Sequence, residues 1–300
     1  MVRPAPTGRL VGMAESRFDV ATAALALDDR RAAVTLDAQW NVDGRILNGG
    51  YLQAVTVRAA SVLLGAPGEP VAVSTSFASP AVAGPAVVSI EVLRRGGRLS
   101  AVSATLHQGQ IPVLASLITF GMVPEDTALR EGLPGAPRMA GAAPGTPRMA
   151  GAAPVMPPTP PPEECLRIPA RQLPGPPGLA ALVDLAFVPE ESRWLAGDTS
   201  AGPAIRCWMS FADDRDMDPL ALVALVDMAP PVSFAQGRFG WAPTLHLQVG
   251  IFARPRGRVV LVDLRGEPYD GAFVAEDAVL WDAEGTLVAQ SRQIAVPPRA

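Results

Sequence analysis

The sequence predicts an α+β fold of two tandem units, each an antiparallel sheet wrapped around a central helix. Three observations lead to this expectation. First, each half of the chain carries a short strand, one helix and four strand-like runs in the same order. Second, both helices are apolar on most sides, and a helix that is apolar all round must be buried. Third, a segment rich in Pro, Gly and Ala separates the two halves.

The N-terminal unit is expected to span residues 1–121. A short strand around Trp40 precedes a helix at 48–65, for which Asn48 is a suitable N-cap. Four strand-like runs follow, at 71–80, 86–97, 99–109 and 111–121. They are rich in Val, Ile, Thr and Ser and are bounded by Gly and Pro, a pattern that indicates antiparallel strands.

The C-terminal unit is expected to span residues 187–300 and to repeat this order. A strand at 205–211 precedes a helix at 218–231, with Asp218 as the N-cap and Pro219 as the first helical residue. Four strand-like runs follow, at 244–255, 257–266, 271–285 and 287–296. The chain therefore reads as one unit that was duplicated and then diverged.

Residues 122–186 separate the two units and are predicted to form a linker, largely disordered over 122–164. This segment is rich in Pro, Gly and Ala, and it has no amphipathic period that would let it pack. It includes a tandem decapeptide, GAPRMAGAAP at 135–144 followed by GTPRMAGAAP at 145–154. The lack of packing signals favours a spacer.

The composition excludes several classes of chemistry. The net charge is −4 and the pI about 5.3, so no basic surface for nucleic acid is expected. Apart from two histidines, every basic residue is Arg, which excludes a Schiff-base lysine and a P-loop lysine. Cys165 and Cys207 are too few and too isolated for a disulfide framework or a zinc site, and no metal is expected.

No segment of the sequence indicates a membrane. Residues 1–20 lack the continuous apolar core of a signal peptide, and no uninterrupted apolar run reaches the ~18 residues of a membrane span. We therefore expect no membrane span and a cytoplasmic location.

The run ALVALVDMAPPV at 221–232 contains a single carboxylate, Asp227. Burial of a lone charge is costly, so Asp227 reaches solvent at a helix end, has hydrogen-bond partners, or acts in a pocket. Pro230 and Pro231 should end the helix just before them, which puts Asp227 in the last turn. There the helix dipole and the apolar neighbours both raise the pKa of a carboxyl group and make it a more effective base.

Two pairs of segments occur in the same order along the chain. The first pair is NGGYLQAVTVRAA (48–60) and SFASPAVAGPAVVSIEVLRRGGRLSAVSATL (76–106). The second pair is DPLALVALVDMAPP (218–231) and WAPTLHLQVGIFARP (241–255). The segment VAQSRQ (288–293) follows the second pair. In this order they resemble the double-hotdog acyl-CoA thioesterases, the thioesterase II type. The resemblance covers nearly the whole chain except the linker, and it implies a double hotdog.

The resemblance also implies a reaction, the hydrolysis of acyl-CoA thioesters. In that family an Asp on the helix, a Thr on a strand and a Gln near the end of the last strand hold the water, and these roles match Asp227, Thr244 and Gln293. A carboxylate can act as general base toward that water, and a hydroxyl and an amide can fix its direction of attack. Because water is the nucleophile, no metal or other cofactor is needed. Proteins of this fold usually assemble, so a homo-oligomer is expected.

Strand alternation bears on two of these residues. Gln293 shares a face with residues that are small and mostly apolar: Leu287, Ala289, Ser291 and Ala295. It is therefore expected to point inward, the alternative being an ordinary polar residue at a strand end. Thr244 shares a face with His246 and Gln248, opposite the apolar face of its strand. Strict alternation places Thr244 away from the core, unless a bulge or the edge of the strand turns it inward.

The oxyanion of a thioester reaction needs hydrogen-bond donors, and backbone N–H groups near a helix start can supply them. Gly49 and Gly50 begin the first helix and allow close backbone approach, so they are candidate substrate-binding residues. Val57 and Thr119 occupy the N-terminal positions that correspond to the proposed helix Asp and strand Gln. We therefore expect one site per chain, in the C-terminal unit near the contact between the units.

Three other functions compete with a thioesterase. The main alternative is a non-catalytic acyl-CoA or acyl-group binding protein, which would keep the fold without turnover. A hydratase or dehydratase of this fold would be expected to place a His beside an Asp near the helix, but His107 and His246 lie on predicted strands. No GxSxG motif occurs, which argues against a Ser-His-Asp hydrolase.

Overall fold

The computed structural model describes residues 15–65, 68–125, 154–168, 178–267 and 272–298. Its N-terminal half contains, in order, α1 (Arg17–Ala21), β1 (Ala24–Ala26), β2 (Arg31–Leu36), the short 3-10 helix η1 (Ala38–Trp40), α2 (Gly49–Leu64), β3 (Glu69–Phe77), β4 (Gly84–Arg94), β5 (Leu99–Gln108) and β6 (Ile111–Gly121).

The C-terminal half repeats much of this order. It contains the 3-10 helix η3 (Pro162–Glu164), β7 (Leu166–Arg167), η5 (Leu179–Ala181), β8 (Val183–Phe187), η6 (Pro189–Glu191), η7 (Arg193–Ala196), β9 (Ala204–Phe211), α3 (Pro219–Leu225), η8 (Phe234–Gln236), β10 (Thr244–Ile251), β11 (Val260–Gly266), β12 (Val274–Asp282) and β13 (Leu287–Ala295). The four strand-like runs that the sequence predicts in each half are therefore present.

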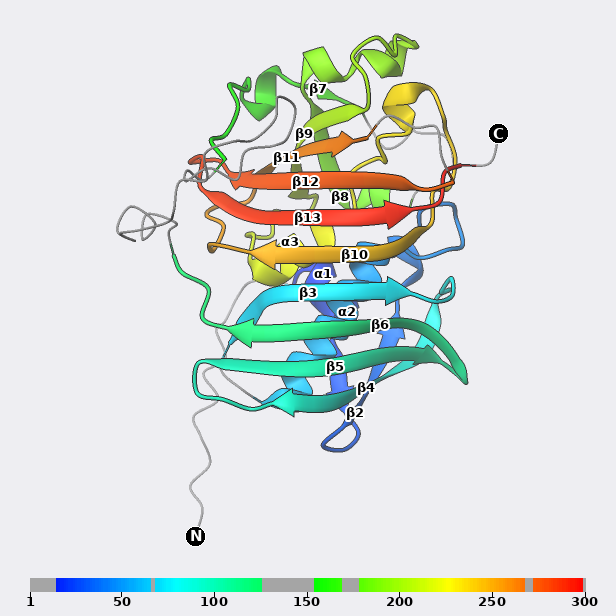
Figure 1. Ribbon diagram of the computed structural model, residues 1–300, viewed down its shortest axis with the longest axis vertical. Coiled ribbons are helices and arrows are strands. Elements are labelled where there is room, and N and C mark those ends of the chain that lie inside the picture. The colour runs from blue at the N-terminus through cyan, green and yellow to red at the C-terminus, as the bar shows by residue number, and fades with distance from the viewer. Residues whose placement is uncertain (1–14, 66–67, 126–153, 169–177, 268–271, 299–300) are drawn as a thin grey trace, which may run out of the picture.

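The strands of the described residues form one 13-stranded sheet in the order β1-β2-β4-β5-β6-β3-β10-β13-β12-β11-β9-β8-β7. The order is nearly mirrored about its centre, where β3 of one half pairs antiparallel with β10 of the other, from His246 opposite Ser76 to Gly250 opposite Ala72. Helices α2 and α3 lie behind this sheet and pack against each other (Figure 1). The mirrored order is what a duplication of one helix-and-strand unit predicts.

Helix α2 is bounded by the residues that the sequence indicates. Asn48 accepts a hydrogen bond from the backbone N–H of Tyr51, and Gly65, which has a positive φ of 57°, caps the C-terminus of the helix. Even polar side chains of α2, such as Gln53 and Thr56, are fully buried. The helix is therefore an internal one, as its apolar surface predicts.

The region around Trp40 forms a 3-10 turn, so the prediction of a strand there is wrong. The side chain of Asp37 accepts a hydrogen bond from the backbone N–H of Gln39 and starts η1. The strand of this region is β2, which ends before Asp37. Trp40 is buried and its ring stacks on that of Tyr51, with ring centroids 5.1 Å apart.

Helix α3 begins as predicted but ends earlier than expected. Asp218 accepts a hydrogen bond from Ala221 N, and Pro219 is the first helical residue. The helix ends at Leu225, because Asp227 N and Met228 N donate to carbonyls three residues back rather than four. Asp227 therefore lies in a tight turn that follows the helix, not in its last turn.

The predicted linker, 122–186, is structured over part of its length. Strand β7 lies inside it and β8 (Val183–Phe187) begins inside it; β7 pairs with β8 and β8 with β9. The prediction of disorder is also wrong for residues 154–164, since Trp281 Nε1 donates to Pro154 O and Trp208 Nε1 donates to Pro160 O. This Pro-rich segment covers an apolar cluster on the C-terminal half, which an amphipathic period does not detect. Most of the tandem decapeptide lies outside the described residues.

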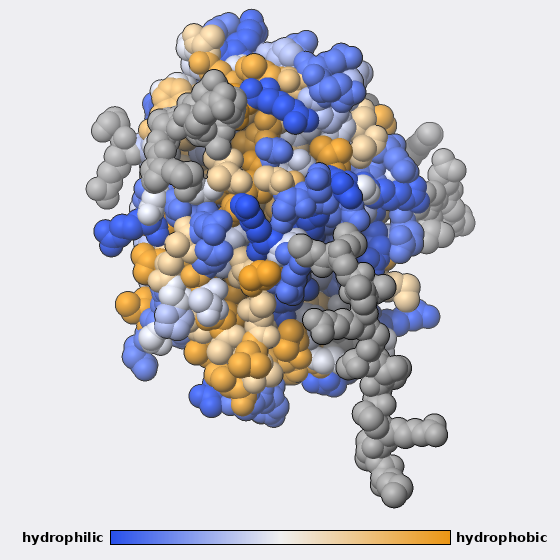
Figure 2. Space-filling model, turned by 180° about the vertical axis from the view of Figure 1, so that it is seen from behind, coloured by the Kyte–Doolittle hydropathy of each residue, from blue (hydrophilic) through white to orange (hydrophobic). Residues whose placement is uncertain are grey.

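Exposed apolar side chains gather at the end of the molecule that carries the N-terminal half, as the view from behind shows (Figure 2). Leu25 and Leu27 lie at or next to β1, the edge strand, and are 69% and 54% exposed. Among the described residues, no helix is long and apolar enough to cross a membrane. The expected homo-oligomer stays a prediction.

Candidate active site

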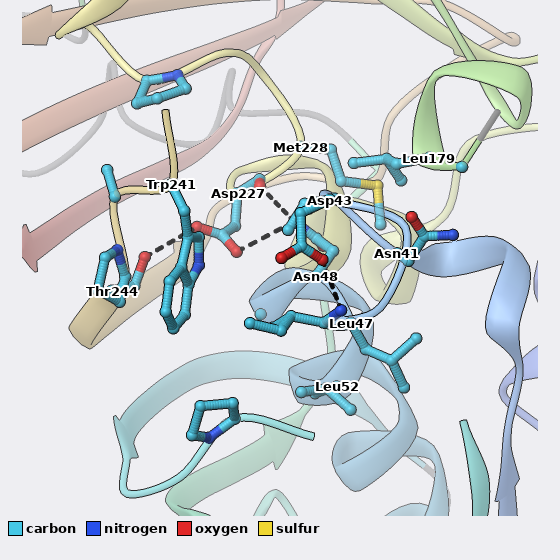
Figure 3. Close-up of a pocket in the computed structure, with 18 of the residues that line it drawn as sticks. Asn41, Asp43, Leu47, Asn48, Leu52, Leu179, Asp227, Met228, Trp241 and Thr244 are labelled. Carbon is cyan, nitrogen blue, oxygen red and sulfur yellow. Dashed lines mark hydrogen bonds between the residues drawn. The ribbon is translucent and has the colours of Figure 1, made fainter. Parts of the chain in front are cut away.

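The carboxylate of Asp227 is held by the start of helix α2. The backbone N–H of Gly50 donates to its Oδ2 across 2.7 Å. Asn48 Nδ2 lies 2.8 Å from the backbone carbonyl oxygen of Asp227 and 3.4 Å from Oδ2. Figure 3 shows Asp227 between Asn48 on one side and Thr244 on the other. Oδ2 is therefore engaged by the N-terminal half, which leaves Oδ1 facing Thr244.

Thr244 and Gln293 complete the group that the resemblance implies. The Thr244 hydroxyl lies 2.9 Å from Gln293 Oε1 and 3.4 Å from Asp227 Oδ1, and it donates its one proton to the nearer oxygen. Gln293 is 9% exposed and points inward, as strand alternation predicts. The structure thus brings all three side chains together from a turn and two neighbouring strands.

A register shift turns Thr244 toward Asp227. Thr244 lies opposite Ala295 and His246 lies opposite Ile294, so β10 has one residue more than β13 between these pairs. Leu245 takes up the extra position and is 38% exposed. A β-bulge at the first residues of the strand therefore lets Thr244 point inward, although strict alternation places it away from the core.

Glu276, on β12, extends the group into the core. Its carboxylate accepts hydrogen bonds from Val232 N, at 2.9 Å, and from Gln293 Nε2. Glu276 is only 2% exposed, and burial raises the pKa of its carboxyl group. A chain of hydrogen bonds therefore runs from Glu276 through Gln293 to Thr244.

The pKa of Asp227 is raised from 3.8 to about 7. Desolvation is the main cause, and the negative charge of Glu276 adds to it. The hydrogen bond from Gly50 N–H and the nearby Thr244 hydroxyl oppose this rise because both favour the charged form. The direction agrees with the sequence argument, although the carboxylate is bonded to the N-terminus of α2, whose dipole favours a negative charge.

The two glycines at the start of α2 make this contact possible. A Cβ on Gly50 would overlap the carbonyl oxygen of Ala224, and a Cβ on Gly49 would lie 2.7 Å from Asp227 Oδ2. The N–H of Gly50 is already bonded to Asp227, so in this structure it is not available to an oxyanion. Gly49 lines the pocket described next, and its role toward a substrate stays a prediction.

An apolar pocket of about 680 Å³ opens beside Asp227, a size typical of small-molecule sites. Its lining includes Asn48, Thr244 and Gln293 together with apolar side chains from both halves, among them Leu52, Phe77, Met228 and Trp241. Trp241 lies beside Asp227 and Thr244 (Figure 3). A mostly apolar pocket with a few convergent polar groups suits a substrate with an apolar portion and one polar reacting centre.

Sequence reasoning missed two members of this site. The sequence indicates Asn48 only as a helix cap, whereas its side-chain amide also donates to the backbone carbonyl of Asp227. Glu276 was hidden in a strand-like run, but it alternates with Val274 and Ala278, both buried. An acidic residue on the apolar face of a strand is the signal that could have found it.

Other chemistry has no matching geometry among the described residues. No group of three or more His, Cys, Asp and Glu side chains there could hold a metal ion. The ring of His246 lies between the hydroxyls of Ser74 and Ser76, at 3.4 and 3.3 Å. His246 does not contact Asp227, and neither histidine lies on a helix, so the pairing expected of a hydratase does not occur there.

Comparison with known proteins shows a likeness over both halves of the chain. Models of the acyl-CoA thioesterase N-terminal domain and of the acyl-CoA thioesterase C-terminal domain match residues 36–121 and 162–296. The chain is 32% identical over 276 residues to an uncharacterized protein of Mycobacterium tuberculosis, covering 88% of this chain and 89% of that protein.

Solved structures show the same likeness. A candidate thioesterase II from Thermobifida fusca is 30% identical with a TM-score of 0.79, over 96% of this chain and 100% of that one. A protein of unknown function with a hot dog fold from Alicyclobacillus acidocaldarius is 21% identical with a TM-score of 0.77, over 96% and 100% of the two chains.

The sheet and this structural likeness define a protein of the hotdog fold. The matches over both halves go further, and the chain belongs to the acyl-CoA thioesterase family.

Proposed function

We propose that this chain is a double hotdog that hydrolyses acyl-CoA thioesters to the free carboxylic acid and CoA. One observation carries the proposal: Asp227, Thr244 and Gln293 meet within hydrogen-bond distance at the wall of an apolar pocket. Membership of the acyl-CoA thioesterase family supports the same reaction.

Asp227 is the proposed general base. Its Oδ2 is bonded to Gly50, and its Oδ1 is the atom that faces Thr244 and the pocket. A carboxyl group with a pKa of about 7 is well matched to proton transfer near neutral pH. Gln293 Oε1 offers the water a second acceptor, and Thr244 donates to that same oxygen, so that together they fix the direction of attack.

The proposed reaction has two steps. Oδ1 of Asp227 takes a proton from the water as the water oxygen forms a bond to the carbonyl carbon of the thioester. The tetrahedral intermediate then collapses, the C–S bond breaks, and the proton passes from Asp227 to the sulfur of the leaving thiolate. The products are the carboxylic acid and the thiol of CoA, and the carboxylate of Asp227 is regenerated. No cofactor takes part.

The second candidate function is acyl-CoA binding without hydrolysis. The pocket favours it to the same degree, because apolar walls bind an acyl group whether or not a water is activated beside it. The raised pKa of Asp227 favours hydrolysis, because a purely binding site needs no base beside its apolar walls.

The test is release of free thiol from a panel of short, medium, long and aromatic acyl-CoAs. Wild type is expected to turn over at least one of them, and Asp227→Asn to lose about 10²–10⁴-fold in kcat because it removes the base. Folded wild type that binds acyl-CoA but releases no thiol from any member would support the binding protein instead. Binding of each ester, measured by calorimetry, separates the two outcomes.

A further inference from the structure

Glu276 is a buried carboxylate that the proposed reaction does not use. It lies on β12 with its two oxygens facing two different donors, Val232 N and Gln293 Nε2. Both donors are uncharged. Burial of an ionised carboxylate without a cation beside it is costly, and a neutral side chain of similar size would fill the same space at lower cost. The position of Glu276 therefore calls for a reason other than packing.

The hydrogen-bonding chemistry of the two side chains supplies that reason. An ionised carboxylate only accepts hydrogen bonds, whereas an amide has one end that donates and one that accepts. The carboxylate of Glu276 can therefore accept a hydrogen bond only from the Nε2 end of Gln293. The other end, Oε1, then faces Thr244, which donates to it at 2.9 Å. The carboxylate thus selects one of the two orientations that the amide of Gln293 could adopt.

We propose that Glu276 is a positioning residue that holds Gln293 with its carbonyl oxygen toward Thr244 and the reacting water. The proposal rests on the proposed thioesterase function. With this orientation, the water meets two acceptors, Gln293 Oε1 and Asp227 Oδ1, one for each of its protons. With the amide reversed, an NH₂ group would face Thr244 and could not accept a proton from the water.

Glu276→Gln tests this selection directly. The backbone N–H of Val232 is fixed and needs an acceptor, so the oxygen of the new amide is expected to face Val232 and its NH₂ to face Gln293. Gln293 would then turn its own oxygen toward position 276 and its NH₂ toward Thr244. We expect kcat to fall roughly 10- to 100-fold, as for other misplaced groups at a reacting centre, with little change in KM.

The exchange of the two side chains provides a rescue. In Glu276→Gln combined with Gln293→Glu, the new amide at 276 donates to the carboxylate at 293, which again presents an acceptor to Thr244. The exchange keeps the total charge and nearly the same volume. The double variant is expected to be more active than the product of the two single effects predicts, which a double-mutant cycle measures.

The pH profile supplies a readout that a merely structural role would not move. Among the described residues, Asp227 is the titratable group on which Glu276 acts, and the charge of Glu276 raises the pKa of Asp227. Glu276→Gln removes that charge, so the acid limb of kcat/KM is expected to move to lower pH.

Asp277→Asn is the matched control, since Asp277 is the next residue of β12 and pairs with Arg292 at the exposed surface. We expect this variant to keep the wild-type kcat and pH profile.

The outcomes separate this inference from the proposed function. If wild type releases no thiol from any acyl-CoA, the proposed function fails. If wild type is active and Asp227→Asn is not, but Glu276→Gln keeps wild-type kcat and an unmoved acid limb, the positioning role is overturned. If Glu276→Gln loses activity only because it unfolds, its melting temperature falls and the exchange gives no rescue, which also overturns the role.

Discussion

The backbone N–H of Gly50 and the Oδ2 of Asp227 are 2.7 Å apart, so the beginning of one helix holds the carboxylate that follows the other. The contact joins the two halves of the chain at the point where the pocket opens. Neither half contains the whole arrangement: Asn48 and Gly50 come from the first, and Asp227, Thr244 and Gln293 from the second. The candidate site is therefore a property of the assembled pair of halves.

Gly50→Ala should damage this contact. A Cβ there would overlap Ala224 O and lie 3.0 Å from Asp227 Cβ, so helices α2 and α3 must separate. Overpacking of this kind costs about 1–3 kcal/mol in the free energy of unfolding, which denaturant titration measures. Gly97→Ala is the control, because nothing lies within 4 Å of a Cβ at that position. Equal stability of the two variants would contradict the close approach.

The pH dependence of turnover should report Asp227. The base must be ionised to accept a proton, and its pKa is raised to about 7. We therefore expect kcat/KM to be half-maximal near pH 7 and to fall about tenfold per pH unit below it. Initial rates of thiol release between pH 5 and 9, with a pH-insensitive thiol probe, measure the limb. A midpoint at the ordinary value of an exposed Asp would show that Asp227 does not act as the base.

The stability of Asp227→Asn should depend on pH in a defined direction. Because the folded pKa lies above the ordinary value of 3.8, the folded state binds more protons than the unfolded state between about pH 4 and pH 7. Ionisation of Asp227 therefore destabilises wild type as the pH rises through this range. At pH 8 we expect Asp227→Asn to be more stable by about 1–2 kcal/mol, a value reduced for the partial exposure of this side chain.

The same comparison at about pH 4 supplies the control. There Asp227 is protonated in the folded state, and the two proteins should have nearly equal unfolding free energies. Asn can still accept the Gly50 hydrogen bond through its own oxygen, so loss of that contact does not confuse the measurement. A variant less stable than wild type at pH 8 would contradict the burial of an ionised Asp227.

The hydroxyl of Thr244 should matter more than its shape. Thr244→Val keeps the branched side chain at the bulge and removes the donor to Gln293, so kcat is expected to fall roughly 10- to 100-fold. Thr244→Ser keeps the donor and should retain most of the activity. Thermal unfolding of both variants shows whether the strand has stayed intact. Equal kcat in the two variants would remove the hydroxyl from the mechanism.

The sequence predicted the strands and caps better than the details of the site. Alternation and turn residues are local, so the eight long strand runs and the caps Asn48 and Asp218 follow from neighbouring residues alone. The inward side of Gln293 follows from the same reasoning. The bulge that turns Thr244 could be named only as a possibility, because it depends on how β10 pairs with β13.

Other features depend on contacts between distant residues and left no local pattern. The composition of the segment 154–164 suggests a spacer. Its position is nevertheless fixed by distant partners, because the carbonyls of Pro154 and Pro160 accept hydrogen bonds from the rings of Trp281 and Trp208. The same holds for Gly50, whose N–H donates to a carboxylate 177 residues further along the chain.

Trp241 should determine how well long acyl groups bind. It lines the pocket beside Asp227 and is 46% exposed, which is a large apolar surface for an acyl chain to cover. Trp241→Ala removes that wall, and burial of an aromatic side chain is worth about 1–3 kcal/mol. We expect KM to rise roughly tenfold or more for long-chain acyl-CoAs and to change little for acetyl-CoA, with kcat nearly constant.

Phe273→Ala is the matched control for this variant, because Phe273 is 60% exposed and does not line the pocket. Its KM should be unchanged for every acyl length. The test compares KM between long and short acyl groups rather than absolute activity. A general loss of folding would lower the turnover of all esters alike, which distinguishes it from the loss of an acyl contact. A KM that rises equally for acetyl-CoA and for long esters would place Trp241 against the CoA portion instead, and the acyl group would then occupy the side of the pocket lined by Leu52 and Met228.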